Sequence, residues 1–456
     1  MHMKRYFETY LREWKERKSR KPLIIRGARQ IGKTFTIEEF ANNNYTNLVK
    51  LNFEEKPELK DFFKTNDVVD IKQSIEVYFS TKITEETTLL FFDEIQQCPK
   101  AIVALRYFYE KLPKIHLIAA GSLLDHTLND MKYSMPVGRV EFAYMHPLNF
   151  YEFILALGEA SLIEYLNNYS IDKPISLPIH KKLLNLVRLY YFIGGMPEAV
   201  NEYAETKDLT SVERIHESIL KSLEYDFSKY GTRAQQEILV TLLKYIPIGL
   251  GRKIKYVNID QNHRSDAIKL ALKLLEMSRI IQLIKSTKAN GLPLEQGVDD
   301  KIIKPLFLDI GLANHILKLR LIDIENLTTI NEGSLAEQFI GQQLLSNLPE
   351  YLDSQIYYWV REAKNSAAEL DFVTEINNQI VPIEVKAGKT GTLKSLHIYM
   401  KEKKLKKALR FNSDLPSLMT VSANLRIAKE DTEVDYDLLS LPLYLALESK
   451  RLVLRK

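Results

Sequence analysis

Gly27-Ala28-Arg29-Gln30-Ile31-Gly32-Lys33-Thr34 is the stretch of this sequence that predicts a fold most directly. It follows the pattern G-x-x-x-x-G-K-[ST], in which a glycine-rich turn leads to a lysine and a hydroxyl residue. The apolar run Leu23–Ile25 precedes the turn, and a run with helical character, Thr34–Phe40, follows it. A strand, a glycine-rich turn and a helix in this order predict an α/β domain with a parallel sheet.

The residues of this turn have the chemistry needed to hold a chain of phosphate groups. Two glycines let the backbone point its N–H groups inward at phosphate oxygens. The ammonium group of Lys33 can reach the β- and γ-phosphates, the hydroxyl of Thr34 can ligate Mg²⁺, and the following helix adds its positive end. We therefore predict that ATP and Mg²⁺ bind along residues Gly27, Ala28, Arg29, Gln30, Ile31, Gly32, Lys33, Thr34 and Phe35.

A second segment supplies the carboxylates that such a site requires. Thr88–Phe92 is a run of apolar and β-branched residues that predicts a buried strand, and Asp93 and Glu94 follow at its carboxyl end. Ligands bind at the carboxyl edge of an open parallel sheet. We expect Asp93 to hold Mg²⁺ and Glu94 to orient or deprotonate the attacking water.

Composition excludes several other classes of protein. The chain has 456 residues, enough for about three domains, with 45% hydrophobic and 27% charged residues, as in soluble globular proteins. Its net charge of +4 is too mild to indicate nucleic-acid binding by itself, and Cys98 is its only cysteine, which rules out an internal disulfide. No apolar run reaches the roughly 18 residues of a membrane helix. Because Met1–Trp14 is charged and has no apolar signal core, we expect a cytoplasmic protein.

The order of motifs resembles a known family. Besides the two segments above, it includes Ala120-Gly121-Ser122, Gly138-Arg139-Val140, His146–Phe153 and Phe192–Glu198. From about residue 20 to the end, the chain resembles the bacterial and archaeal AAA-type P-loop ATPases that carry an uncharacterised C-terminal domain. The resemblance implies a nucleotide-dependent switch rather than a metabolic kinase.

Two further residues acquire candidate roles from this resemblance. Ser122 follows the predicted strand Ile115–Ala120, where AAA+ ATPases place a polar residue between the γ-phosphate and the catalytic water. Arg139 is a candidate arginine finger, acting within its own subunit or on a neighbour. The alternatives are a hydroxyl that satisfies a turn and a structural arginine at the edge of the domain.

The middle of the chain predicts a helical lid followed by a winged-helix-like unit. Residues 154–230 have apolar residues at helical spacing, interrupted at Gly194–Pro197. Residues 231–300 predict a long helix, Ser265–Met277, and a basic hairpin of two strands, Ile280–Ile284 and a segment ending near Leu294. A winged helix can place such a helix in the major groove of DNA, or it can serve only for packing.

The C-terminal part carries a second pattern of charged residues. Two predicted strands, Ala368–Val373 and Gln379–Lys386, can form a hairpin on which Asp371, Glu384 and Lys386 converge. With Glu337 on an upstream helix, this set resembles the PD-(D/E)xK restriction-endonuclease-like fold. The resemblance implies metal ligation by Glu337, Asp371 and Glu384 and activation of water by Lys386. The alternative is a fold that persists without cutting.

These interpretations define four predicted segments: an AAA-type P-loop ATPase domain at 1–153, a helical lid at 154–230, a winged-helix-like domain at 231–300 and a nuclease-like α/β domain at 301–456. The basic segment Lys386–Arg410, with a helix expected over Leu396–Arg410, can lie along a phosphate backbone or simply be a solvated helix. We expect the nucleotide state to control DNA engagement by the C-terminal half. The alternative is a nucleotide-gated protein-interaction switch with an inactive docking domain. Candidate partners are DNA, a protein, or a second copy through the ATPase domain.

Overall fold

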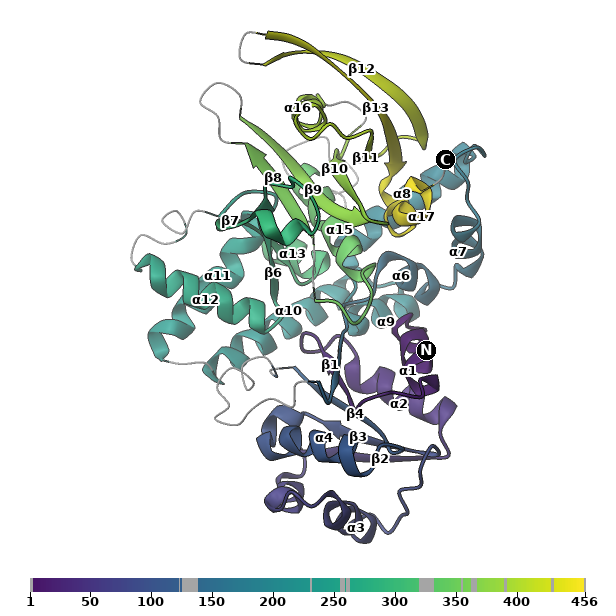
Figure 1. The fold of residues 1–456 in the computed structure, drawn as a ribbon, viewed down its shortest axis with the longest axis vertical. Helices are drawn as coiled ribbons and strands as arrows, with labels where there is room; N and C mark the ends of the chain where they lie inside the picture. Colours follow the sequence, from purple (N-terminus) through teal and green to yellow (C-terminus); the bar gives the residue numbers. More distant parts are fainter. Residues whose placement is uncertain are drawn as a thin grey trace.

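The computed structural model places two sheets at opposite ends of an elongated molecule, with helices between them (Figure 1). The structure describes residues 3–122, 124, 138–229, 232–254, 259, 263–319, 332–353, 356–361, 367–388, 392–427 and 430–454. Within these residues, no helix is both long enough and apolar enough to cross a membrane.

The first sheet is entirely parallel and has the strand order β2-β3-β4-β1-β5. Its strands are β1 (Leu23–Arg26), β2 (Asn47–Asn52), β3 (Thr88–Asp93), β4 (His116–Gly121) and β5 (Glu141–Tyr144). The helices of this part are α1 (Phe7–Glu16), α2 (Lys33–Asn44), η1 (Pro57–Lys64), α3 (Val68–Tyr78), η2 (Ile95–Gln97) and α4 (Pro99–Lys111). All residues of β3 and β4 are buried, because helices cover both faces of the sheet. The predicted parallel α/β architecture is therefore confirmed.

A group of helices follows the parallel sheet and joins it to the rest of the molecule. They are α6 (Phe150–Ala156), α7 (Ala160–Asn167), α8 (Leu177–Ile193), α9 (Pro197–Thr206), α10 (Leu209–Asp226) and η3 (Phe227–Lys229). Asn149 and Glu152 form a capping box that fixes the start of α6. Gly194 ends α8 with a φ of 74°, and Pro197 opens α9, so the predicted break in the helical pattern lies where the sequence placed it.

The predicted hairpin differs from the observed one. After α11 (Arg233–Ile248), α12 spans Ser265–Met277 as expected, and β6 spans Ile281–Thr287. The expected second strand ending near Leu294 is wrong, because a short 3-10 helix, η5 (Leu294–Gly297), occupies that place and the partner strand is β7 (Val298–Phe307). β6 also pairs in parallel with β8 (Tyr357–Arg361). The boundary predicted between residues 300 and 301 therefore falls inside a strand, and the hairpin extends the C-terminal sheet.

The second sheet has the strand order β12-β13-β11-β10-β9-β8-β6-β7. Its remaining strands are β9 (Ala368–Ile376), β10 (Gln379–Val385), β11 (Lys407–Asn412), β12 (Ser417–Ile427) and β13 (Glu430–Pro442). The helices around it are α13 (Ile310–Leu317), α15 (Glu332–Ser346), α16 (Lys394–Lys403), η6 (Leu443–Glu448) and α17 (Ser449–Val453). The helix expected over Leu396–Arg410 is wrong in its second half, because α16 ends at Lys403 and β11 pairs with β10 and β13 from Lys407.

The two ends of the molecule share one continuous apolar core. Side chains from α1, β1, the helices α6 to α10, α15 and the inner strands of the second sheet belong to the same buried cluster. Figure 1 shows α15 near the centre, between the two sheets. The backbone N–H of Tyr144, at the end of β5, donates a 2.7 Å hydrogen bond to the carbonyl of Glu350, just after α15. This shared core packs the parallel sheet and the C-terminal sheet against the same set of helices.

Candidate nucleotide site and C-terminal acidic cluster

The glycine-rich turn lies at the carboxyl end of β1 and leads directly into α2. Gly32 precedes the first residue of α2 and has a φ of 88°, a left-handed conformation that glycine adopts without strain. The N-terminus of a helix with free backbone N–H groups is a favourable place for a phosphate. The side chains of Ala28 and Ile31 are buried in the core. These two predicted nucleotide-binding residues can therefore contribute only through their backbones.

Lys33 is held inside the loop. Its ammonium group donates hydrogen bonds to the carbonyl oxygens of Gly27 at 3.0 Å and Ala28 at 2.6 Å. Burial lowers the pKa of Lys33 to about 8, although the nearby carboxylates of Glu94 and Asp93 work in the opposite direction. A phosphate group would add negative charge and stabilise the protonated lysine.

Thr34 and Asp93 meet across the gap between the loop and β3. The Thr34 hydroxyl lies 3.1 Å and 3.2 Å from the two carboxylate oxygens of Asp93 and donates to them. The ammonium group of Lys50, on the neighbouring strand β2, lies 3.3 Å from the same carboxylate. A hydroxyl and a carboxylate are oxygen donors suited to Mg²⁺, which usually takes few protein ligands and completes its shell with phosphate and water. The residues present therefore fit the predicted ion.

Glu94 is positioned by an unusual backbone conformation. Its φ is 49°, and its carboxylate accepts a hydrogen bond from the side-chain amide of Gln96. Burial raises the pKa of Glu94 above its ordinary value, although Gln96 and Lys33 work against this shift. The side-chain oxygen Oε1 of Gln96 abuts Gly121, since a Cβ added to that glycine would lie 2.0 Å from it. Gln96 thus locks the loop after β3 against the end of β4, next to Ser122.

One cavity collects most of the predicted residues. It has a volume of 530 Å³ and is lined by Met3, Arg5, Arg29, Gln30, Gly32, Lys33, Thr34, Phe35, Thr36, Glu94, Ser122, Pro197, Glu198 and Asn201. Because β1, β3 and β4 are parallel, the residues that follow each strand lie at the same edge of the sheet. The sequence motifs predicted the lining residues that come from the glycine-rich loop and from the ends of β3 and β4. They did not predict that Met3, Arg5 and residues of α9 line the same cavity. The motif Phe192–Glu198 includes the start of α9 and is a signal that could have placed this helix at the cavity. Nothing in the sequence marks Arg5 as a residue of the site.

The C-terminal hairpin brings three of its predicted residues together. β9 and β10 pair antiparallel with Ile383 opposite Phe372, and the backbone N–H of Val385 donates to Asp371 at 2.7 Å. The ammonium group of Lys386 lies 2.5 Å from Glu384. Burial, together with the charge of Asp371, raises the pKa of Glu384 to about 7. The expected convergence of Asp371, Glu384 and Lys386 is therefore present.

The fourth predicted residue, Glu337 on α15, has a partner that the sequence did not suggest. Lys304 on β7 lies 3.1 Å from Glu337, 2.9 Å from Glu369 and 3.8 Å from Asp371. Lys253 lies 3.1 Å from the other oxygen of Glu369. Among the residues that the structure describes, no group of three or more histidine, cysteine, aspartate or glutamate side chains is arranged to hold a metal ion. In this arrangement the C-terminal acids do not fit the divalent cation predicted for them, because a lysine lies among them.

The N-terminal geometry agrees with a family model. Residues 19–154 match the model described as an AAA domain. This part of the chain is an AAA domain of the P-loop type. Residues 184–322 and 332–439 match two models described as domains of unknown function, DUF8612 and DUF4143. No protein of curated function matches the chain.

Solved structures with similar elements share little sequence with this chain. C. elegans PCH-2 is 13% identical with a TM-score of 0.26, and the match covers 45% of this chain and 62% of that protein, less than two thirds of its length. The Aeropyrum pernix ORC1 protein, solved in complex with DNA, is 11% identical with a TM-score of 0.31 over 69% of this chain and 91% of that one. The Thermotoga maritima RuvB Holliday junction branch migration motor is 16% identical with a TM-score of 0.28 over 60% and 87%.

Within its own chain, Arg139 lies away from the nucleotide cavity of the AAA domain. It precedes β5, whose first residue, Glu141, pairs with Leu23 at the start of β1. It therefore lies at the amino edge of the parallel sheet, opposite the edge that carries the glycine-rich loop. There it forms a 3.0 Å ion pair with Glu110 at the end of α4. Its predicted finger role within the same subunit finds no support in this placement, and action on a neighbouring copy stays a prediction.

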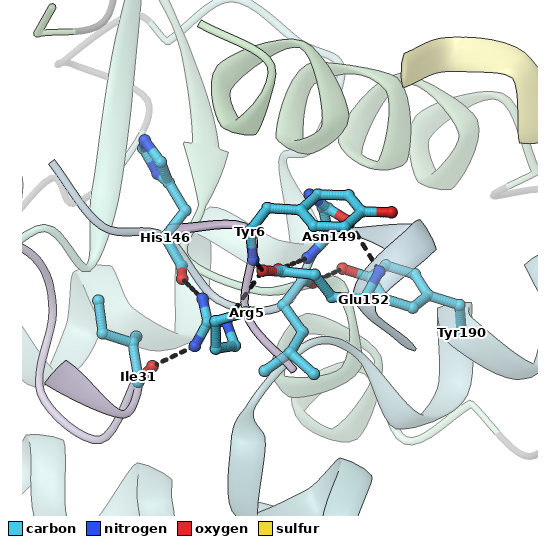
Figure 2. A network of polar contacts seen from close by, with 8 residues as sticks. Arg5, Tyr6, Ile31, His146, Asn149, Glu152 and Tyr190 are labelled. Atoms are coloured by element: carbon cyan, nitrogen blue, oxygen red, sulfur yellow. Dashed lines mark hydrogen bonds and ion pairs between the residues drawn. The ribbon is translucent and has the colours of Figure 1, made fainter. Parts of the chain in front are cut away.

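Arg5 connects the glycine-rich loop of the AAA domain with the segment that follows β5 (Figure 2). Its guanidinium group donates to the carbonyl oxygens of Ile31 at 2.9 Å and His146 at 2.7 Å, and to the carboxylate of Glu152 at 3.1 Å. Glu152 also accepts from the backbone N–H of Tyr6. Both side chains of the pair are almost fully buried. The start of the chain therefore fixes the position of the phosphate loop relative to α6.

Proposed function

We propose that this protein is a Mg²⁺-dependent ATPase whose nucleotide state is transmitted to its C-terminal half. The observation that carries the proposal is the meeting of Lys33, Thr34 and Glu94 around one cavity of 530 Å³, with Asp93 in contact with Thr34. These groups come from two separate segments of the AAA domain, and each has the chemistry that phosphoryl transfer requires. ATP is favoured over GTP because the sequence contains no N/T-K-x-D segment for reading guanine.

Each residue has a separate task in the proposed reaction. The backbone N–H groups around Gly32 hold phosphate oxygens, and the Lys33 ammonium stabilises the charge between the β- and γ-phosphates. Thr34 and Asp93 would hold Mg²⁺, which neutralises charge on the phosphates when bound. The Glu94 carboxylate accepts the proton of the attacking water, and its raised pKa brings it closer to the range in which a general base works best.

The route from the nucleotide to the C-terminal half is made of buried hydrogen bonds. Arg5 joins the loop to Glu152, which caps α6 together with Asn149. The first residue of α6, Phe150, donates its N–H to the side chain of Gln343 on α15 at 2.8 Å. Less than two turns earlier on the same helix, Glu337 reaches the acidic cluster. A shift of the loop on hydrolysis can therefore move α15 relative to the second sheet.

A second route passes through the turn between α8 and α9. The backbone N–H of Gly195 donates to Asp309 at 2.6 Å, and its carbonyl accepts from Leu148 at 2.7 Å. Gln342, beside Gln343 on α15, donates to Asp309 at 3.2 Å. Because Pro197 and Asn201 line the nucleotide cavity, α9 and α15 are both connected to the site.

For the C-terminal half we propose DNA engagement, with a catalytically inactive docking domain as the second candidate. Two groups of exposed cations support contact with a phosphate backbone. They are Arg264, just before α12, with Lys269 and Lys273 on it, and Lys394, Lys401 and Lys404 around α16. The position of Lys304 among the predicted metal ligands supports the docking candidate over cleavage. Salt-dependent binding of duplex DNA, or its absence, separates the two.

The ATPase proposal is tested with two substitutions in the full chain. Lys33→Ala is expected to abolish hydrolysis and to weaken nucleotide binding. Glu94→Gln is expected to bind ATP normally and to hydrolyse it about 10²-fold more slowly. Exposed Glu55→Gln serves as the control and is expected to behave like the unmodified protein. Unchanged release of phosphate by Lys33→Ala would remove the proposal.

A further inference from the structure

Lys304 is a buried lysine that lies among the acidic residues of the C-terminal half. Its side chain is 5% exposed and contacts Glu337 and Glu369 at hydrogen-bond distance, with Asp371 at 3.8 Å. It comes from β7, whereas its partners come from α15 and β9. A buried ammonium group is retained only where carboxylates compensate the loss of hydration. Three elements therefore meet around this one positive charge.

The positive charge of Lys304 also stabilises the carboxylates around it. Glu337, Glu369, Asp371 and Glu384 form a group of four acids, and Lys253, Lys304 and Lys386 are the cations in contact with them. Without Lys304, two of the acids that face it, Glu337 and Asp371, would repel each other in a region of low dielectric. One atom of the group, the Oε2 of Glu384, is buried and has no hydrogen-bond partner. The cluster is therefore close to charge balance without any added ion.

Lys304 also occupies the space that a divalent cation would need. Mg²⁺ binds oxygen ligands at about 2.0–2.1 Å in near-octahedral geometry. An ion shared by Glu337 and Asp371 would have to lie between these carboxylates, where the Lys304 ammonium now makes its contacts. Two cations cannot share that position, since both repulsion and volume oppose it.

We propose that the Lys304 ammonium is the resident cation of the C-terminal acidic cluster and takes the place of a divalent metal between Glu337 and Asp371. In this arrangement the lysine holds α15 to the second sheet, and the cluster is a nearly charge-balanced connection rather than a metal-dependent cutting site. The inference rests on the C-terminal half alone, so its failure would leave the ATPase proposal untouched, and the reverse also holds.

The test measures Mn²⁺ binding to the full chain without nucleotide, by electron paramagnetic resonance, with Asp93→Asn in every arm to remove the nucleotide-associated ion. The protein with Lys304 intact is expected to bind no Mn²⁺ at the acidic cluster. Lys304→Met, which keeps the length of the side chain and removes its charge, is expected to bind Mn²⁺ there, with a dissociation constant at least about tenfold below the weakest binding that the measurement detects. This binding is expected to disappear in Lys304→Met/Asp371→Asn.

Lys253→Met is the matched control. It removes a cation that pairs with the far oxygen of Glu369, at 3.1 Å, and leaves the space between Glu337 and Asp371 filled. It is expected to leave Mn²⁺ binding unchanged, whereas a gain equal to that of Lys304→Met would show that total charge, not occupancy, decides. The proposal is also overturned if the protein with Lys304 binds Mn²⁺ and Asp371→Asn abolishes that binding.

A loss of stability in Lys304→Met would still give an answer. The thermal midpoint of this variant is then compared with and without Mn²⁺, beside Lys304→Arg, which retains the charge. Rescue of Lys304→Met by Mn²⁺, with no shift for Lys304→Arg, supports the proposal, since the metal replaces the missing cation. Absence of rescue contradicts it.

Discussion

The guanidinium group of Arg5 lies 2.9 Å from the carbonyl oxygen of Ile31, in the middle of the phosphate-binding loop. The same group binds Glu152 on α6, 147 residues further along the chain. A loop that binds phosphate must keep a fixed shape while its charge environment changes. Arg5 therefore connects the loop with α6, which in turn contacts α15. The segment around Arg5 is thus a structural part of the site, as the glycines of the loop are.

Arg5→Met is expected to lower the free energy of unfolding by about 3–5 kcal/mol, because it leaves the buried carboxylate of Glu152 without its cation. Arg12→Met is the control, since Arg12 is exposed and pairs with Glu8 at 3.6 Å on the surface, where removal costs less than about 1 kcal/mol. Urea denaturation followed by circular dichroism measures both. Equal stability losses would contradict the structural role given to Arg5.

Nucleotide binding is expected to become coupled to proton uptake above pH 8, because burial lowers the pKa of Lys33 to about 8 in the free protein. Between this value and the ordinary 10.5, the unfolded chain binds more protons at Lys33 than the folded chain. Without nucleotide this group therefore adds stability as the pH rises through that window. Phosphate favours the charged lysine, so ATP affinity is expected to fall in the same window.

Calorimetry of ATP binding in buffers with different ionisation enthalpies measures the proton uptake. Lys33→Arg keeps a permanent positive charge, and it is expected to show no such uptake even where its affinity is reduced. A proton uptake of equal size in Lys33→Arg would assign the effect to another group.

Gly32→Ala is expected to weaken nucleotide binding, because its φ of 88° is strained for any residue with a side chain at a cost of about 1–3 kcal/mol. Gly158→Ala provides a close control: Gly158 has a φ of 83°, and no atom lies within 4 Å of an added Cβ. Both variants are expected to lose similar stability, whereas only Gly32→Ala loses affinity for nucleotide. Loss of affinity in both would mean that strain alone, rather than the loop, is responsible.

Gln343→Leu is expected to keep ATP hydrolysis but to remove the effect of nucleotide on the C-terminal half, since it breaks the hydrogen bond between Phe150 and α15. The readout is DNA affinity measured with ATP and with ADP, in the Glu94→Gln background so that ATP persists. Gln379→Leu, at an exposed position on β10, is the control. A nucleotide effect that survives Gln343→Leu would point to the second route through Gly195 and Asp309.

The motifs of the sequence predicted the local structure of the glycine-rich loop and of the strand that ends in Asp93, because each of these parts is local. Glycine gives the loop at 27–34 its turn, and the residues that follow it form the helix α2. The strand β3 ends in Asp93, and this holds for any position that the strand takes in a parallel sheet. Their meeting follows from the rule that parallel strands present their carboxyl ends at one edge. The position of Arg139 did not follow, since the strand after it starts at the opposite edge.

The parts that sequence reasoning missed depend on contacts between distant segments. Lys304 and Glu337 lie 33 residues apart, and β6 pairs with β8 although β7, α13 and α15 lie between them in the sequence. Neither pairing can be read from the spacing of apolar residues within a short stretch of sequence. The apolar residues of Leu396–Arg410 fit a helix as well as a helix followed by a strand, and tertiary pairing of Leu409 with β10 and β13 decided the outcome.

The central claim is that the loop at 27–34 binds a nucleoside triphosphate. Isothermal titration calorimetry of the folded full chain with ATP and Mg²⁺ tests it most directly, beside Lys33→Ala under the same conditions. We predict saturable binding at one site in the unmodified protein and a large loss of affinity in Lys33→Ala. Absence of binding heat at several temperatures with ATP, GTP and their nonhydrolysable analogues would contradict the claim.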